Sequence, residues 1–175
     1  LITGSKGVVG SWLEKMLKDK GHEVFGIDLY HAVGEKGWEH EMSRGNWHYA
    51  RCDIGNFRQL ERIFRLAGPF DYVYNAAAEF GRWNGEDYYE KVWQSNAIGT
   101  KNIIKLQEQL GFRLIHFSSS EVYGDYDDVM QEDVMNKVVI KQMNDYAMSK
   151  WVNEMQIRNS IIQHNTETVI VRLFN

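Results

Sequence analysis

Short runs of β-branched and aromatic residues alternate along the chain with longer segments in which apolar positions recur at helical spacing. Such alternation is typical of parallel strands joined by helical crossovers, and it predicts an α/β fold with a doubly wound parallel sheet and helices on both faces. We expect strands near residues 1–3, 23–28, 47–52, 71–76, 113–118 and 168–173, and helices near residues 8–20, 56–67, 86–110 and 143–164.

Local signals refine the ends of these helices. Ser11 and Asn56 are residues that can start a helix, because their side chains can accept a hydrogen bond from an exposed backbone N–H group. Gly21 and Gly111 can end one, because glycine tolerates the left-handed conformation that often follows a helix.

Two stretches, 30–46 and 124–142, are rich in glycine or in acidic residues and predict loops. We expect them to lie over the carboxyl edge of the sheet. Ligands of doubly wound sheets bind at that edge, so the functional residues are expected there as well.

Composition excludes several classes of protein. The 175 residues, 43% of them hydrophobic, predict one globular domain over residues 1–175. The net charge is −4 and the 20 basic residues are dispersed, so we expect no nucleic-acid partner. The apolar runs are too short to span a bilayer, and the single cysteine, Cys52, fits a reducing compartment, which predicts a cytoplasmic protein without a membrane partner. The six histidines fall at no metal-ligand spacing, so no metal is expected.

A glycine trio follows the first apolar strand and stands at the mouth of the first helix. Gly4 would permit a tight turn, Gly7 the approach of a pyrophosphate to bare backbone, and Gly10 close packing of helix on strand. The helix N-terminus adds unpaired N–H groups and a positive dipole. The expected phosphate cradle comprises Gly4, Ser5, Lys6, Gly7, Val8, Val9 and Gly10. A flexible loop is the alternative for an isolated trio.

Acidic residues end the next two strands. Eighteen residues after Gly10, the second strand ends on Asp28, whose carboxylate can accept hydrogen bonds from the adenosine ribose hydroxyls. Its charge would repel a 2′-phosphate, so NAD is favoured over NADP as the cofactor. The third strand ends at Cys52 and Asp53, and capping of the following helix is the alternative role for Asp53.

A Tyr-x-x-x-Lys pair follows the fifth strand. Tyr146 and Lys150 stand four residues apart on one face of the expected last helix, where the ammonium can lower the pKa of the phenol. The spacing alone is weak evidence, but the pair follows a strand whose polar exit begins with Ser118, Ser119 and Ser120. Hydroxyls at the carboxyl end of a strand are expected to face the cofactor.

These motifs together resemble the extended short-chain dehydrogenases of the NAD-dependent epimerase/dehydratase family, whose Rossmann domain binds NAD. The resemblance covers essentially the whole chain. The matching segments are, in order, Thr3 to Gly10, Asp28, Asp53, Asn75 to Ala78, Ser95 to Thr100, Ser118 to Gly124, Tyr146 to Lys150, and Arg172 to Asn175.

The resemblance implies a role for each matching residue. Tyr146 would take a proton from the sugar 4-hydroxyl, Lys150 would be its electrostatic partner and a ribose anchor, and Ser119 would be the third hydrogen-bonding member. Asp53 would bind on the adenine side. The remaining cofactor contacts would come from Ile54, Asn75, Ala76, Ala77, Ala78, Asn96 and Ser118.

Glu121 separates the subfamilies. A dehydratase typically has Thr-Asp-Glu where this chain has Ser119, Ser120 and Glu121, so the missing Asp speaks against dehydration. UDP-glucuronate decarboxylases resemble this chain in carrying Ser-Glu-Val-Tyr-Gly. The resemblance therefore implies a nucleotide-sugar epimerase or decarboxylase acting through a transient 4-keto sugar. The alternatives for the protein are a 4,6-dehydratase, a simple carbonyl oxidoreductase and a non-catalytic dinucleotide-binding protein. For Glu121 itself, the alternative is a solvated loop residue.

Two further expectations concern the whole protein. The chain opens on Leu1 without an initiator Met and ends inside a strand, which suggests a fragment that lacks most of a C-terminal substrate lobe. Trp93 and Trp151 lie on helices that would flank the sheet, and pairing of two such helices predicts a homodimer. Ordinary burial of these helices against their own sheet is the alternative.

Overall fold

The computed structural model describes residues 1–30, 48–80 and 87–174. Its sheet has six strands in the order β3-β2-β1-β4-β5-β6, and every neighbouring pair is parallel. The strands are β1 (Ile2–Thr3), β2 (Gly26–Asp28), β3 (Tyr49–Arg51), β4 (Tyr72–Asn75), β5 (Arg113–Ser119) and β6 (Thr168–Leu173). All six lie where the hydrophobic pattern predicts them.

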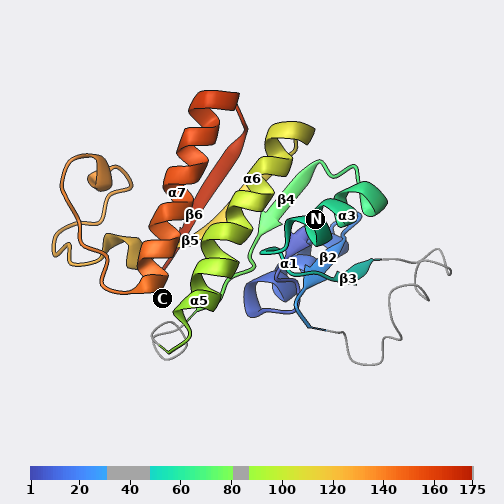
Figure 1. Cartoon of the computed structure of the whole chain (residues 1–175), viewed down its shortest axis with the longest axis horizontal. Coiled ribbons are helices and arrows are strands. Elements are labelled where there is room, and N and C mark those ends of the chain that lie inside the picture. Colours follow the sequence, from blue (N-terminus) through green and yellow to red (C-terminus); the bar gives the residue numbers. More distant parts are fainter. Residues whose placement is uncertain (31–47, 81–86, 175) are drawn as a thin grey trace.

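The helices are distributed over both faces of the sheet, as predicted (Figure 1). Right-handed crossovers and the change of direction after β3 place α1 on one face and the later helices on the other. The helices are α1 (Val8–Asp19), α3 (Phe57–Ala67), α5 (Tyr89–Val92), α6 (Gly99–Leu110) and α7 (Asp145–His164). The carboxyl ends of β1 and β4 adjoin at the switch between the two directions, where doubly wound folds bind ligands.

The predicted helix ends are confirmed with one exception. Asn56 caps α3 by accepting from the Gln59 backbone N–H at 3.2 Å. Gly21 and Gly111 follow their helices with φ values of 82° and 76°. Ser11 as a start is wrong, because α1 begins at Val8 and the Ser11 hydroxyl instead donates to the Val8 carbonyl.

The expected helix over 86–110 contains an irregularity. Within the described residues it consists of α5, a π-helical segment η1 (Trp93–Ile98), and α6. A π-helical turn widens the helix and shifts the side chains that follow. The expected loop 30–46 lies outside the described residues except for Tyr30. The loop 124–142 is described and contains one short 3-10 turn, Val134–Asn136.

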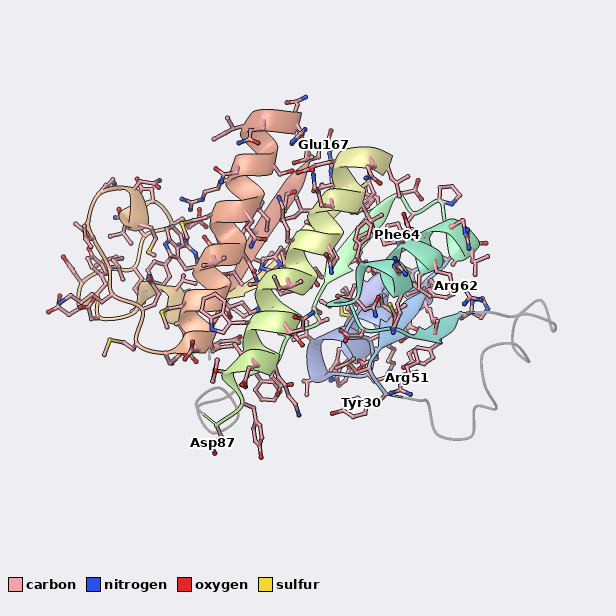
Figure 2. All side chains as sticks on the ribbon, in the orientation of Figure 1. Tyr30, Arg51, Arg62, Phe64, Asp87 and Glu167 are labelled. Carbon is pink, nitrogen blue, oxygen red and sulfur yellow. The ribbon has the colours of Figure 1, made fainter. Side chains whose placement is uncertain are left out.

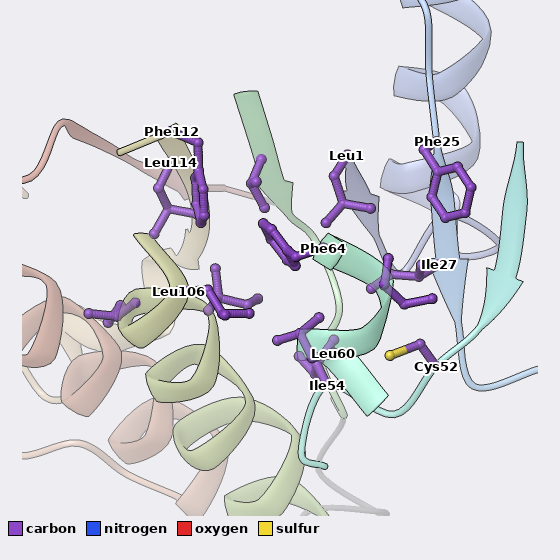
Figure 3. Packing of buried hydrophobic residues seen from close by; sticks show 14 of the residues in the cluster. Leu1, Phe25, Ile27, Cys52, Ile54, Leu60, Phe64, Leu106, Phe112 and Leu114 are labelled. Carbon is purple, nitrogen blue, oxygen red and sulfur yellow. The ribbon is translucent and has the colours of Figure 1, made fainter. Parts of the chain in front are cut away.

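The main core lies between the sheet and the helices of one face. Leu60 and Phe64 of α3 and Leu106 of α6 point toward Ile27 and Leu114 of the sheet (Figure 3). Full burial of side chains of this kind stabilises a fold by about 1.5–3 kcal/mol each. This packing holds the strand ends, and therefore the loops that follow them, at fixed positions.

Cys52 belongs to the same core. Burial, assisted by the negative charge of Asp53, raises the pKa of its thiol to about 12. The thiol is therefore protonated at neutral pH and has the character of a packing residue. None of the helices within the described ranges has the length and apolar character needed to cross a membrane.

Candidate active site

Two adjoining cavities lie at the carboxyl edge of the sheet. The smaller has a volume of about 290 Å³ and the larger about 520 Å³. Both are lined by the glycine loop and by alanines that follow β4. The smaller is lined further by Asp28, Asp53, Ile54 and Ala77, and the larger by Val8, Val9, Gly10, Ser118, Ser119, Ser120, Glu121, Tyr146 and Lys150.

Two glycines of the loop leave no room for a side chain. Gly4 has φ +67°, and a Cβ atom there would lie 2.7 Å from the Ala77 backbone nitrogen. At Gly10 a Cβ atom would lie 2.1 Å from the Gly4 carbonyl oxygen. Helix α1 begins directly after Gly7, with no side-chain cap and no acidic residue in its first turn. Its N-terminal N–H groups and positive dipole therefore remain available to an anion.

Asp28, at the end of β2, is hydrogen-bonded to the glycine loop. One carboxylate oxygen accepts from the Lys6 backbone N–H at 2.9 Å, and the other accepts from the Leu29 N–H at 2.7 Å. The Lys6 ammonium lies 4.1 Å from the centre of the Tyr49 ring. Arg51, near the ends of β2 and β3 in Figure 2, donates to the Leu29 carbonyl at 2.8 Å. The carboxylate thus has a structural contact on each oxygen while it lines the cavity.

Asp53 and Ser5 are both expected to contact the cofactor, but only Asp53 lines a cavity. Asp53 lines the smaller cavity and accepts from the Gly55 N–H at 2.8 Å. The cap of α3 is Asn56, so the helix-capping alternative for Asp53 is wrong. Ser5, in contrast, is buried against Gly26, and its side chain lines neither cavity. Its hydroxyl has no hydrogen-bond partner in the described structure.

Asn75 lies beneath the cavities and does not line them. Its carbonyl accepts from the Thr3 hydroxyl at 2.8 Å, and its amide donates to the Thr100 hydroxyl at 3.1 Å. The same amide lies 3.2 Å from His116 Nδ1, which assigns the ring proton to Nε2. Burial, with the charge of Lys150 as a second cause, holds the pKa of His116 well below its usual range. Asn75 therefore joins the first, fourth and fifth strands, and leaves cavity lining to the alanines that follow it.

Asn96, on the π-helical segment, is a second buried connector. Its side chain accepts from the Glu79 N–H at 2.9 Å and donates to the Glu79 carbonyl at 3.0 Å. It also donates to the Ser149 hydroxyl at 2.9 Å, which links the turn after β4 to α7. Its side chain lines neither cavity, whereas the adjacent Ser95 lines the smaller one.

Tyr146, Lys150 and Ser119 all line the larger cavity, so the structure brings together the three residues that the sequence predicts as neighbours. The Lys150 ammonium lies 5.8 Å from the centre of the Tyr146 ring and donates to the Phe117 carbonyl at 2.8 Å. Burial lowers the pKa of Lys150 to about 8.

The pKa of Tyr146 is displaced in the direction opposite to the one expected. Burial raises it and the negative charge of Glu121 adds to this, while a hydrogen bond with Ser119 opposes the change. The expectation that Lys150 lowers this pKa is wrong for the protein without cofactor, because desolvation of the phenolate dominates. A base at this position needs further positive charge beside it.

Glu121 lies at the rim of the larger cavity and is exposed, but it is not without a partner. One of its carboxylate oxygens accepts from the Asn144 amide at 3.0 Å. Asn144 also caps α7, by accepting from the Ala147 N–H at 2.7 Å. Asn144 is not among the site residues that the sequence predicts, although an Asn two residues before Tyr146 is a recognisable helix-start signal.

A buried ion pair supports the serine-rich end of β5. Arg172 of β6 donates from Nε and Nη2 to the two carboxylate oxygens of Glu154 on α7, at 2.9 and 2.8 Å. Ser118 donates to Glu154 at 2.7 Å, and the third Arg172 nitrogen donates to the Tyr123 hydroxyl at 2.7 Å. The hydroxyl of Ser118 is thus occupied by Glu154, although the residue lines the larger cavity. In the part of the chain that the structure describes, no three His, Cys, Asp or Glu side chains gather in a metal-binding group.

The chain is similar to known proteins over its whole length. The family model described as "NAD dependent epimerase/dehydratase family" matches residues 1–175. UDP-glucuronic acid decarboxylase 1 from Danio rerio is 31% identical over 100% of this chain and 40% of its own length. Protein CapI from Staphylococcus aureus is 29% identical over 99% of this chain and 53% of its own.

Solved structures share the fold. The epimerase Mth375 from Methanothermobacter thermautotrophicus has a TM-score of 0.82 at 26% identity, over 99% of this chain and 50% of its own. MoeE5 in complex with UDP-glucose and NAD has a TM-score of 0.75 at 22% identity, over 97% of this chain and 51% of its own. The chain thus spans about half the length of these proteins, or less. Since the family model covers every residue, the chain belongs to the NAD-dependent epimerase/dehydratase family.

Proposed function

We propose that the protein is an NAD-dependent nucleotide-sugar epimerase or decarboxylase that works through a transient 4-keto sugar. The observation that carries this proposal is the shared cavity, in which Tyr146, Ser119 and Lys150 stand beside the glycine loop and Glu121 stands at the rim. The UDP-glucuronic acid decarboxylases among its relatives favour the same chemistry. The single buried cysteine fits a reducing compartment, so we propose the cytoplasm as its location.

The residues at the cavity fit NAD. The absence of space for a Cβ at Gly4 and Gly10 and the uncapped start of α1 suit a pyrophosphate. Asp28 retains lone pairs for ribose hydroxyls, and Asp53 and Ile54 would lie on the adenine side. When bound, NAD supplies the hydride acceptor and donor and, in its oxidised form, a positive charge near Tyr146.

Tyr146 would accept the proton of the sugar 4-hydroxyl. The Ser119 hydrogen bond favours the phenolate, because it opposes the rise in the pKa of Tyr146. Lys150 is fixed by the Phe117 carbonyl, which leaves further N–H groups for a ribose hydroxyl. Lys150 is buried and Tyr146 is partly buried, which limits the access of water to the proton transfer.

Glu121 would act on the keto intermediate and not on the first oxidation. Its carboxylate is the acidic group that lines the larger cavity, and it lies in the first part of the short turn Ser120–Tyr123, which Ser119 caps. Ser120 stands where a dehydratase of the family has an Asp, so loss of water lacks its usual acid. Epimerisation or decarboxylation of the intermediate is therefore favoured over dehydration.

Product analysis of the full-length protein tests this proposal. The protein is incubated with UDP-glucuronate and, separately, with UDP-glucose, and the products are identified by mass and NMR. We expect a UDP-pentose with release of CO₂, or a C4 epimer, without net consumption of NAD. A 6-deoxy-4-keto product would show that the dehydratase alternative is correct, and stoichiometric NADH release would indicate a simple oxidoreductase.

We also propose a homodimer that pairs through α7. Met148, Met155 and Ile162 stand seven residues apart on this helix and are all exposed, which makes an apolar stripe suited to a partner helix. Trp93 and Trp151, in contrast, have partners within the chain, Asp145 and Arg158. Sedimentation equilibrium of the full-length protein should give twice the monomer mass, and a monomer at micromolar concentration would contradict the proposal.

A further inference from the structure

Asn144 has two different hydrogen bonds, one on each end of its amide. Its oxygen accepts from the Ala147 backbone N–H at 2.7 Å and so caps α7. Its nitrogen donates to Glu121 at 3.0 Å. A helix cap needs only the oxygen, and serine, threonine or aspartate would serve there equally well. The nitrogen therefore makes a contact that capping does not explain.

Asn144 joins two different elements that both line the larger cavity, the turn after β5 and the start of α7. Glu121 belongs to the turn after β5, where its backbone N–H donates to the Ser119 hydroxyl at 3.2 Å. Tyr146 lies in the first turn of α7, two residues after Asn144, and it lines the same cavity as Ser119 and Glu121. Hydrogen bonds thus run from Ser119 through Glu121 to Asn144, which caps the helix that carries Tyr146.

Without the Asn144 amide, no hydrogen bond in the described structure would hold the Glu121 carboxylate. A glutamate side chain has several rotatable bonds, and an exposed one would spread over many rotamers. A hydrogen bond to a charged group is stronger than one between neutral groups. Solvent exposure weakens the Asn144 contact, but it still selects one position of the carboxylate beside the cavity.

We propose that Asn144 is a positioning residue, which holds the Glu121 carboxylate at a fixed place relative to Tyr146 while it caps the helix that carries Tyr146. The inference rests on the proposed function, because Glu121 has a chemical role only if a sugar intermediate forms in the cavity. It predicts that the electrostatic influence of Glu121 on Tyr146 depends on the amide of residue 144.

The charged and titratable groups around Tyr146 define what the test can measure. The end of β5 contributes Ser119 and Glu121, and α7 itself contributes Lys150. Asp145 is adjacent in sequence, but its carboxylate accepts from Trp93 on the π-helical segment at 2.7 Å. Of these groups, Asn144 contacts only Glu121 through its side chain in the described structure.

The test uses the full-length protein with Asn144→Ser, which keeps a capping oxygen and removes the amide donor. Glu121→Gln and the double variant complete a cycle. Asn56→Ser is the matched control, because Asn56 caps α3 in the same way and lines neither cavity. The pKa of Tyr146 is followed by NMR of protein labelled at the tyrosine Cζ, with Tyr146→Phe to assign the signal.

We expect Asn144→Ser to lower the pKa of Tyr146 in the direction of Glu121→Gln, because the released carboxylate moves away from the phenol. The double variant should titrate like Glu121→Gln alone, and Asn56→Ser like the unaltered protein. If Asn144→Ser leaves the pKa of Tyr146 unchanged, Asn144 is only a cap and the inference is wrong.

A kinetic measurement adds the catalytic consequence. With a nucleotide sugar that is turned over, Asn144→Ser should slow the step after NADH formation by about tenfold or more, the scale on which misplaced groups lose rate. The first hydride transfer should change less than this step. An unchanged second step would contradict the positioning role even if the pKa had moved. If no nucleotide sugar reacts, the proposed function fails, whereas the NMR titration still decides whether Asn144 places Glu121.

Discussion

The glycine loop after β1 and the serine-rich turn after β5 border one cavity, but they are built in different ways. The loop offers backbone alone, and its key positions are ones where a Cβ atom would collide, as at Gly4 and Gly10. The turn offers side chains, and two of them are held by partners distant in sequence, Ser118 by Glu154 and Glu121 by Asn144. Under the proposed function, cofactor binding would depend on the path of the backbone, whereas the side chains proposed as catalytic depend on polar contacts with α7.

The largest effect on stability should come from the buried ion pair of Arg172 and Glu154, which contacts Ser118 at the end of β5. Glu154→Gln would leave the Arg172 charge without its partner, and loss of one member of a buried pair costs about 3–5 kcal/mol. Urea unfolding measures this loss. Glu167→Gln is the matched control. Glu167, labelled in Figure 2, lies just before β6 and pairs with Arg113 at the surface, where an ion pair contributes about 0–1 kcal/mol. Equal effects of the two variants would contradict the distinction between a supporting core pair and a surface pair.

The second largest effect is a pH dependence of stability caused by the buried Lys150 on α7. The pKa of Lys150 is about 8 in the folded, cofactor-free protein and near 10.5 when unfolded, so the unfolded chain binds the proton more tightly. Stability should therefore rise with pH between these two values, by up to about 3 kcal/mol. Lys150→Met should remove that rise, as seen in urea unfolding at pH 7.5 and at pH 10 or so. A rise that is the same in both proteins would assign it to other groups.

The sequence predicts the positions of the local motifs in both regions, but not the buried polar contacts that hold them. The glycine spacing, the strand that ends on Asp28 and the Tyr146 to Lys150 spacing are local patterns, so their positions could be predicted. The buried connectors could not be, because Asn75 and Asn96 follow strand and helix patterns that say nothing of which way a polar side chain points. Their partners become visible only when distant elements are packed together. The predicted lowering of the Tyr146 pKa was wrong for the same reason, because burial, which raises this pKa, depends on tertiary packing.

A smaller effect is expected at the glycine loop. Gly4→Ala would place a Cβ atom 2.7 Å from the Ala77 backbone at a positive φ, so we expect a loss of about 1–3 kcal/mol and an NAD affinity at least about tenfold weaker. Gly21→Ala is the control, because Gly21 also has positive φ but has open space around it. It should cost about 1–2 kcal/mol in unfolding and leave NAD affinity unchanged. Calorimetry that finds normal NAD binding for Gly4→Ala would place the cofactor elsewhere.

The smallest effect should be at Asp28. Asp28→Asn keeps an oxygen for the Lys6 N–H and removes the charge that would repel a 2′-phosphate. The preference for NAD over NADP should fall by about 1 kcal/mol, the value of one solvent-exposed charge contact. Titration of both cofactors into the full-length protein measures it. Equal affinity of the unaltered protein for NADP and NAD would overturn the role of Asp28 in cofactor choice.

The most direct test of the central claim is single-turnover hydride transfer in Tyr146→Phe. The claim is that the backbone-built loop binds NAD while Tyr146 provides the base, so the two functions should separate in this variant. NAD affinity should stay within about twofold, and NADH formation on addition of a UDP-sugar substrate, followed by absorbance, should slow by about 10² or more. Tyr89→Phe, which alters an exposed tyrosine outside both cavities, should behave as the unaltered protein. Near-normal NADH formation in Tyr146→Phe would contradict the account.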